Sequence, residues 1–137
     1  MSAALRNQKR YPDNIVNNIL VGRLYMYRRQ YAKAELSFLK VLRVSPKNEK
    51  VHYYLGRLYL RTKQLARSER HLDRYLGFEL PDDARAYALY SKGLVHYRRK
   101  DYTQAEQLVN QAWKLGKLQR AKKRLKKIQK MRAKVDE

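Results

Sequence analysis

Basic and tyrosine side chains dominate the residues of this sequence that could bind a partner. The 137 residues include 33 lysines and arginines, 12 aspartates and glutamates, and 12 tyrosines, which gives a formal net charge of +21. Arginine guanidinium groups pair with phosphates and carboxylates, and aromatic rings stack on nucleobases. Because so large a positive excess repels itself within a folded domain, the composition favours an anionic partner.

No set of residues has the spacing of a catalytic or metal site. The histidines are separate: we expect His52 and His96 at helix-packing positions and His71 on a helix surface. The adjacent Asp82 and Asp83 are better explained by the positive end of a helix dipole than by acid–base work. There is no cysteine, no glycine-rich phosphate loop and no ligand-spaced cluster. We therefore predict no enzyme, no metal and no cofactor.

A second concentration of charge lies at the C-terminal end. Residues 114–137 carry eleven basic and two acidic side chains, so they hold nine of the 21 net charges. Apolar residues at helical spacing predict an amphipathic helix over residues 118–135; they are Leu118, Ala121, Leu125, Ile128 and Val135. The predicted phosphate-binding tail consists of Lys117, Arg120, Lys122, Lys123, Arg124, Lys126, Lys127 and Lys130.

Three interpretations of this helix stay open. The first is a helix that only covers the end of a helical array, and the second is a covering helix whose basic face also binds an anion. The third is an amphipathic helix on an anionic membrane surface. The cluster at residues 122–127 is also similar to a nuclear-import signal, a pattern that is common by chance in so basic a chain.

A recurring stretch indicates how these residues are positioned. In residues 22–46 a glycine is followed by a tyrosine, a small residue, a large apolar residue and a proline. A similar order begins again at Gly56, 34 residues after Gly22, and at Gly93, 37 residues after that. A period near 34 residues indicates helical pairs stacked in an array.

The residue types suit two helices packed closely together. Gly22 and Ala34 would let the helices approach, and Phe38 would fill the space beside that contact. Pro46 cannot continue the second helix. At these positions the sequence resembles the tetratricopeptide repeat family. The matching residues of the first copy are Gly22, Tyr25, Tyr31, Ala34, Phe38 and Pro46.

The resemblance covers roughly residues 15–117, and later copies depart from it at Ser68, Lys92 and His96. It implies an all-α fold, a right-handed α-solenoid of three antiparallel helix pairs with a C-terminal capping helix. We expect a basic lead over residues 1–12, the repeat domain over 13–117 and the basic helix over 118–137. The predicted pairs are 13–29 with 31–44, 48–62 with 64–77, and 83–99 with 102–115. Pro12 and Asp13 would begin the first of them.

In this family the first helix of each pair lines a concave groove, which here implies a surface of tyrosine and arginine. The implied groove residues are Arg23, Tyr27, Lys50, Tyr53, Arg57, Arg61, Tyr87, Tyr90, Tyr97 and Arg98. Some tyrosines belong to the core, because tyrosine is a common packing residue of these repeats. Members that grip the C-terminal carboxylate of a chaperone peptide use lysine, asparagine and arginine. Their positions hold Ile19, Arg23, Lys50, Tyr54, Tyr87 and Ser91, so we do not expect that clamp.

Two functions follow from the charge and the groove. The first, favoured by the wide distribution of charge, is an accessory protein that docks on RNA, above all ribosomal RNA or another ribonucleoprotein. The alternative is a protein–protein adaptor, similar to a co-chaperone, that holds an acidic or extended peptide in the groove. Neither takes a small-molecule substrate. We expect a cytoplasmic protein without a secretory signal or spanning helix, although the basic first ten residues also fit an organelle presequence.

Overall fold

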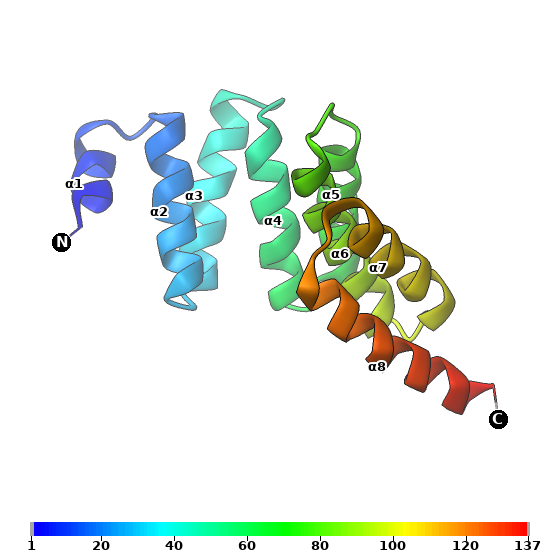
Figure 1. Ribbon diagram of the computed structural model, residues 1–137. Coiled ribbons are helices and arrows are strands. Elements are labelled where there is room, and N and C mark those ends of the chain that lie inside the picture. The colour runs from blue at the N-terminus through cyan, green and yellow to red at the C-terminus, as the bar shows by residue number, and fades with distance from the viewer. Residues whose placement is uncertain (1, 137) are drawn as a thin grey trace.

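The computed structural model describes residues 2–136, and every regular element in that range is an α-helix. The helices are α1 (Ala3–Arg10), α2 (Ile15–Tyr27), α3 (Tyr31–Val44), α4 (Glu49–Arg61), α5 (Leu65–Leu76), α6 (Asp82–Arg98), α7 (Tyr102–Gly116) and α8 (Gln119–Val135). α2 pairs with α3, α4 with α5 and α6 with α7, while α1 packs on α2 and α8 on α7 (Figure 1). The predicted all-α solenoid of three helix pairs and a C-terminal helix is confirmed.

The start of the first pair differs from the prediction that Pro12 and Asp13 begin it. α2 begins at Ile15, because Asn14 caps it by accepting a hydrogen bond from the backbone N–H of Asn17 at 2.8 Å. An asparagine side chain satisfies an unpaired helix N–H, which neither Pro12 nor Asp13 does here. The carbonyl of Pro12 instead accepts a hydrogen bond from Asn18 Nδ2 at 2.7 Å.

The same turn closes the first helix of every pair. A basic residue with left-handed backbone stands at each turn: Arg29 (φ 60°), Lys63 (φ 63°) and Lys100 (φ 64°). The following N–H reaches back five residues to a carbonyl, at 2.8 Å in the first two turns and 2.9 Å in the third. This is the Schellman arrangement, which satisfies carbonyls at a helix end. Because the three turns match, the second helix of each pair returns in the same way.

Each helix pair meets at a glycine. A methyl group on Gly56 would lie 2.7 Å from Leu72 Cδ2, and one on Gly93 would lie 2.6 Å from Val109 Cγ2. Gly22 stands against the ring of Phe38 in the same way. The three partner side chains are fully buried. The predicted close contact therefore exists in all three pairs, and it leaves no space for a β-carbon.

The C-terminal helix covers the last pair with only part of its predicted apolar face. Ala121 and Ile128 are fully buried against α7, whereas Val135 is 68% exposed, so its predicted place on the packed face is wrong. The chain leaves α7 at Lys117, which has a left-handed backbone (φ 52°). Gly116 is the last residue of the helix, and a β-carbon there would collide with Ala86.

The three departures from the repeat pattern make polar contacts. Ser68 Oγ donates a hydrogen bond to the carbonyl of Gly56 at 2.6 Å within the second pair. Lys92 Nζ lies 2.8 Å from Asp73, and His96 Nε2 lies 2.9 Å from Glu69. Polar contacts thus stand at these three positions, while Leu72 and Val95 keep an apolar contact between α5 and α6.

The prediction that His71 lies on a helix surface is wrong. It is half-buried, with its Nδ1 3.1 Å from Nδ1 of the buried His52. Nε2 of His52 lies 3.3 Å from the carbonyl of Pro46, so this nitrogen carries the donated proton. Nδ1 of His52 must then accept from the Nδ1–H of His71, and both rings are neutral. Burial lowers the pKa of both, and the neighbouring His52 helps to bring that of His71 to about 4.

The glycine contact predicts a background-dependent effect of Gly56→Ala. The added methyl group meets Leu72, so we expect the substitution to lower the free energy of unfolding by about 1–3 kcal/mol. In a Leu72→Ala background the methyl group has room, and alanine favours the helix by about 1 kcal/mol over glycine. The penalty should therefore vanish there. Urea unfolding of the four proteins measures this coupling, and an equal penalty in both backgrounds would contradict it.

The histidine pair predicts a loss of stability in acid. The pKa of His71 is about 4 when folded and near 6.5 when unfolded, so the unfolded chain takes up the proton first as the pH falls. The contribution of His71 is complete above about pH 6.5 and is lost as the pH falls towards 4. His71→Phe keeps a ring beside Tyr59 but cannot titrate. As the pH is lowered from 6.5 to 4, the urea midpoint of unfolding should fall less in this variant than in the parent. An equal fall in both proteins would refute the assignment.

Candidate binding groove

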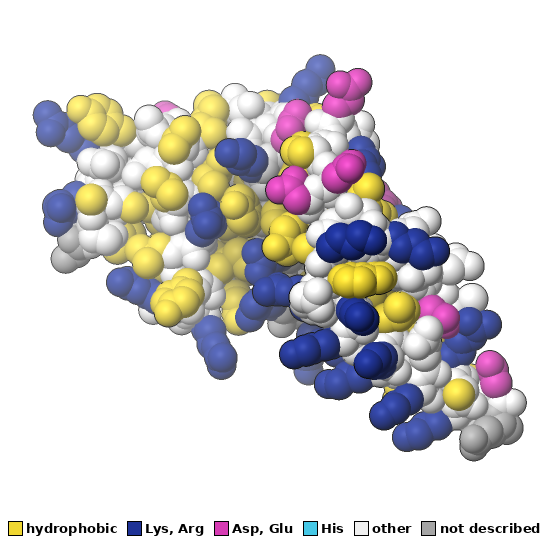
Figure 2. All heavy atoms as spheres, in the orientation of Figure 1, with side chains coloured by type: hydrophobic (Ala, Val, Ile, Leu, Met, Phe, Trp, Pro, Cys, Tyr) yellow, Lys and Arg dark blue, Asp and Glu magenta, His cyan; other side chains and the backbone are white. Residues whose placement is uncertain are grey.

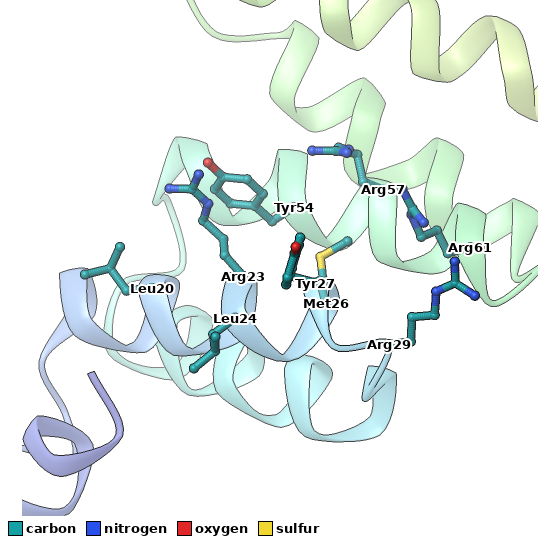
Figure 3. Close-up of a pocket in the computed structure, with 9 residues that line it drawn as sticks. All are labelled: Leu20, Arg23, Leu24, Met26, Tyr27, Arg29, Tyr54, Arg57 and Arg61. Carbon is teal, nitrogen blue, oxygen red and sulfur yellow. The ribbon is translucent and has the colours of Figure 1, made fainter. Parts of the chain in front are cut away.

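The first helices of the three pairs form a groove with two adjoining hollows of about 570 and 650 Å³. The smaller lies between α2 and α4 and is drawn in Figure 3. Its lining consists of Leu20, Arg23, Leu24, Met26, Tyr27, Arg29, Tyr54, Arg57 and Arg61. The larger extends across α4 and α6 to the start of α8 and shares four of these residues. The surface is continuous because α2 contacts α4 and α4 contacts α6.

The α2 side of the groove is rich in exposed apolar side chains. Val16 is 69% exposed, Leu20 47% and Tyr27 88%. Figure 2 shows hydrophobic side chains gathered over the α2–α4 half of this face, with Lys and Arg side chains along α8. Exposed apolar side chains that lie together mark surfaces that other molecules can cover. The two ends of the groove therefore differ in chemistry.

Tyrosine rings hold the groove arginines in place. The guanidinium of Arg23 lies 5.3 Å from the ring centre of Tyr54, and that of Arg57 lies 5.7 Å from the ring centre of Tyr53. These are cation–π distances, at which the ring face attracts the charge. The Tyr54 ring stacks in turn on Phe38 at 5.8 Å, so the core positions this part of the groove.

Tyr53 presents a neutral hydroxyl. Burial raises the pKa of Tyr53 and outweighs the opposite effect of Arg57. The nearby Ser91 of α6 also opposes this rise, but by less. The phenol therefore adds no negative charge beside the arginines at neutral pH.

The groove arginines have no acidic partner. Within residues 2–136, no carboxylate forms an ion pair with Arg23, Arg57, Arg61, Arg98 or Arg120. The acidic residues that line the neighbouring hollows, Glu49 and Asp83, stand near the starts of α4 and α6. The positive charge of the groove is thus left for a ligand.

Nine of the ten expected groove residues line these hollows or the two beside them. They are Arg23, Tyr27, Lys50, Tyr53, Arg57, Arg61, Tyr87, Tyr90 and Arg98. The tenth, Tyr97, lies elsewhere: its ring packs against Tyr102 at 5.7 Å and beneath the guanidinium of Arg124 at 5.7 Å. It belongs to the contact between α6, α7 and α8, because α8 covers the end of α6.

Sequence reasoning missed several residues that line the groove, among them Leu20 and Arg120. Leu20 lies three residues before Arg23, which places both on one helix face, and this spacing could have identified it. Arg120 was assigned to the tail, yet it lines the larger hollow beside Arg98. Its position depends on how the chain turns at Lys117, and no sequence pattern gives that angle.

Apart from Arg120, the predicted phosphate-binding tail divides into two groups. Lys117 and Lys122 lie 5.5 and 5.2 Å from the ring of Trp113, and Arg124 covers Tyr97. The second group, Lys123, Lys126, Lys127 and Lys130, is exposed. Their spacing places these four side chains on one stripe of α8. Nearby, Glu106 is occupied by Arg132 at 2.7 Å and is not available to neutralise them.

The described part of the chain shows no cluster of three or more histidine, aspartate and glutamate side chains that could hold a metal. None of its helices combines the length and the apolar character needed to cross a bilayer.

Comparison with known sequences identifies the family. The tetratricopeptide repeat model matches residues 25–93, just over half of the 137 residues, and the chain therefore belongs to the tetratricopeptide repeat family. No curated protein sequence matches the chain.

Solved structures share the fold at low sequence identity. The first repeat domain of Spaghetti (RPAP3), bound to the HSP90 peptide SRMEEVD, has a TM-score of 0.77 and 18% identity, over 87% of this chain and 93% of that one. MamA has a TM-score of 0.80 and 18% identity, over 96% and 70%. The Sgt2 repeat domain of Aspergillus fumigatus has a TM-score of 0.78 and 16% identity, over 89% and 81%. At these identities the likeness establishes the solenoid fold.

Proposed function

We propose that this chain is a non-enzymatic interaction scaffold whose groove binds an extended, acidic segment of a partner protein. One observation carries the proposal: the larger hollow is lined by five arginines and by no carboxylate. Charge complementarity steers a partner of opposite sign and fixes its register. The apolar side chains at the α2 end would cover apolar residues of the same segment.

The structural neighbours support a protein ligand more than RNA. The repeat domain of RPAP3 was solved with a peptide that contains adjacent glutamates. Recognition by this chain would differ in detail, because Ile19 is buried and Tyr54 and Ser91 stand where the chaperone clamp needs other residues. The alternative of an adaptor for an acidic peptide thus replaces RNA docking as the leading function.

Charge reversal in the groove tests this function. Peptides selected from a random display library against the full chain should be acidic and should bind Arg57→Glu about tenfold or more weakly, because the reversal repels their carboxylates. Arg70→Glu makes the same charge change at an exposed position of α5, outside the groove. Fluorescence anisotropy should find its affinity within about twofold of the parent. Selected peptides that bind Arg57→Glu as tightly as the parent would refute the groove as the site.

A second candidate function rests on the exposed lysine stripe of α8. Lys123, Lys126, Lys127 and Lys130 form no ion pair with any residue that the structure describes. Lysines in such a stripe can follow a phosphate backbone without reading sequence, as RNA docking requires. Deletion of residues 117–137 would also remove the buried Ala121 and Ile128 and uncover α7, so point substitutions are the cleaner test.

RNA docking on this stripe predicts a change in salt dependence. Each phosphate contact adds about 0.9 to the slope of log affinity against log salt. For an RNA hairpin probe, Lys123→Gln/Lys127→Gln should therefore reduce the slope by about 2 relative to the parent. Lys33→Gln/Lys40→Gln removes the same charge from α3 and should leave the slope unchanged. Equal slopes for the parent and the α8 variant would rule out this surface as the RNA site.

A further inference from the structure

Four arginines from three helices converge on the larger hollow of the groove. Arg57 and Arg61 stand one turn apart on α4, Arg98 ends α6, and Arg120 lies in the first turn of α8. We call them the arginine cluster. We propose that the arginine cluster is a phosphoryl-binding subsite, so that the partner segment carries a phosphoserine or phosphothreonine. The proposal rests on the proposed function and names the chemical group that the groove selects.

The choice of arginine supports a phosphoryl ligand. The chain contains 17 arginines and 16 lysines, yet all five cations that line the larger hollow are arginines. Six of the 16 lysines lie on α8 and the others are spread over the chain, but none lines the larger hollow. A guanidinium group presents a planar fork that pairs with two phosphate oxygens at once, whereas lysine acts as a point charge. A general attraction for anions would not require this separation of the two residue types.

The charge balance of the cluster also favours a dianion. Three arginines outside the cluster have acidic partners among the described residues: Arg43 lies 3.6 Å from Asp13, Arg99 lies 2.7 Å from Glu69, and Arg132 lies 2.7 Å from Glu106. The arginine cluster has no such partner among the described residues. One carboxylate brings a single negative charge to the four guanidinium groups. A phosphoryl group brings a charge of about −1.5 to −2 at neutral pH and three acceptor oxygens. These oxygens can accept hydrogen bonds from guanidinium groups of more than one helix.

The apolar floor of the hollow strengthens the attraction. Leu60, 7% exposed, and the half-buried Leu94 lie beneath the arginine cluster. Because most of the arginine cluster is exposed to solvent, this floor makes each charge pair only modestly stronger than it would be in water. The buried Tyr90 also lines this hollow.

Three immobilised peptide libraries test the subsite. They are degenerate at all positions except the centre, which is phosphoserine, aspartate or serine. We expect the full chain to be retained about tenfold more strongly on the phosphoserine library than on the aspartate library. The triple variant Arg61→Gln/Arg98→Gln/Arg120→Gln should lose this preference. The matched control, Arg67→Gln/Arg70→Gln/Arg74→Gln, removes the same charge from exposed positions of α5, outside the groove, and should keep it.

Each other outcome overturns the inference in a recognisable way. Equal retention on the phosphoserine and aspartate libraries would exclude a phosphoryl subsite but leave the acidic-peptide scaffold standing. No retention on any library, together with binding of the RNA hairpin, would exclude both. A preference that the triple variant keeps would place phosphoryl binding outside the arginine cluster.

Discussion

The close approach of the two helices in each pair is the contact on which the rest of the structure depends. Gly22, Gly56 and Gly93 each leave space for a large side chain of the partner helix, and a β-carbon would close that space. Helices that approach so closely can pack in one rotation only, because turning either helix would bring a side chain into the contact. The matching Schellman turns then place α2, α4 and α6 side by side, so residues at equivalent positions face one groove.

This arrangement also distributes the charge of +21 unevenly. The acidic residues Asp73, Glu69 and Glu106 lie on second helices, where they pair with basic residues of the following helix. The groove receives arginines without acids, and α8 receives lysines without acids. Two separate cationic surfaces therefore arise from one excess of charge. The groove combines its charge with fixed tyrosine rings and apolar side chains, which suits a peptide better than a bare phosphate backbone.

The sequence predicted those features that repeat and missed those that depend on a single contact. The glycines could be found because the close contact tolerates little else, and helical phase then placed most of the groove residues. His71 and Tyr97 were placed wrongly, and the place of Arg120 at the groove was missed, because their surroundings come from another helix, whose angle the sequence does not encode locally. Net charge suggested RNA because composition reports how much charge is present and not which surface carries it.

Arginine Nε–H signals in NMR spectra give the most direct test of the groove as the binding surface. Titration of the full chain with an acidic peptide selected by display should shift the signals of Arg57, Arg61, Arg98 and Arg120 together. Those of Arg67 and Arg70 on α5 should stay in place. Shifts confined to the backbone amides of residues 122–130, with the groove arginines unchanged, would contradict the account and place the ligand on the outer face of α8.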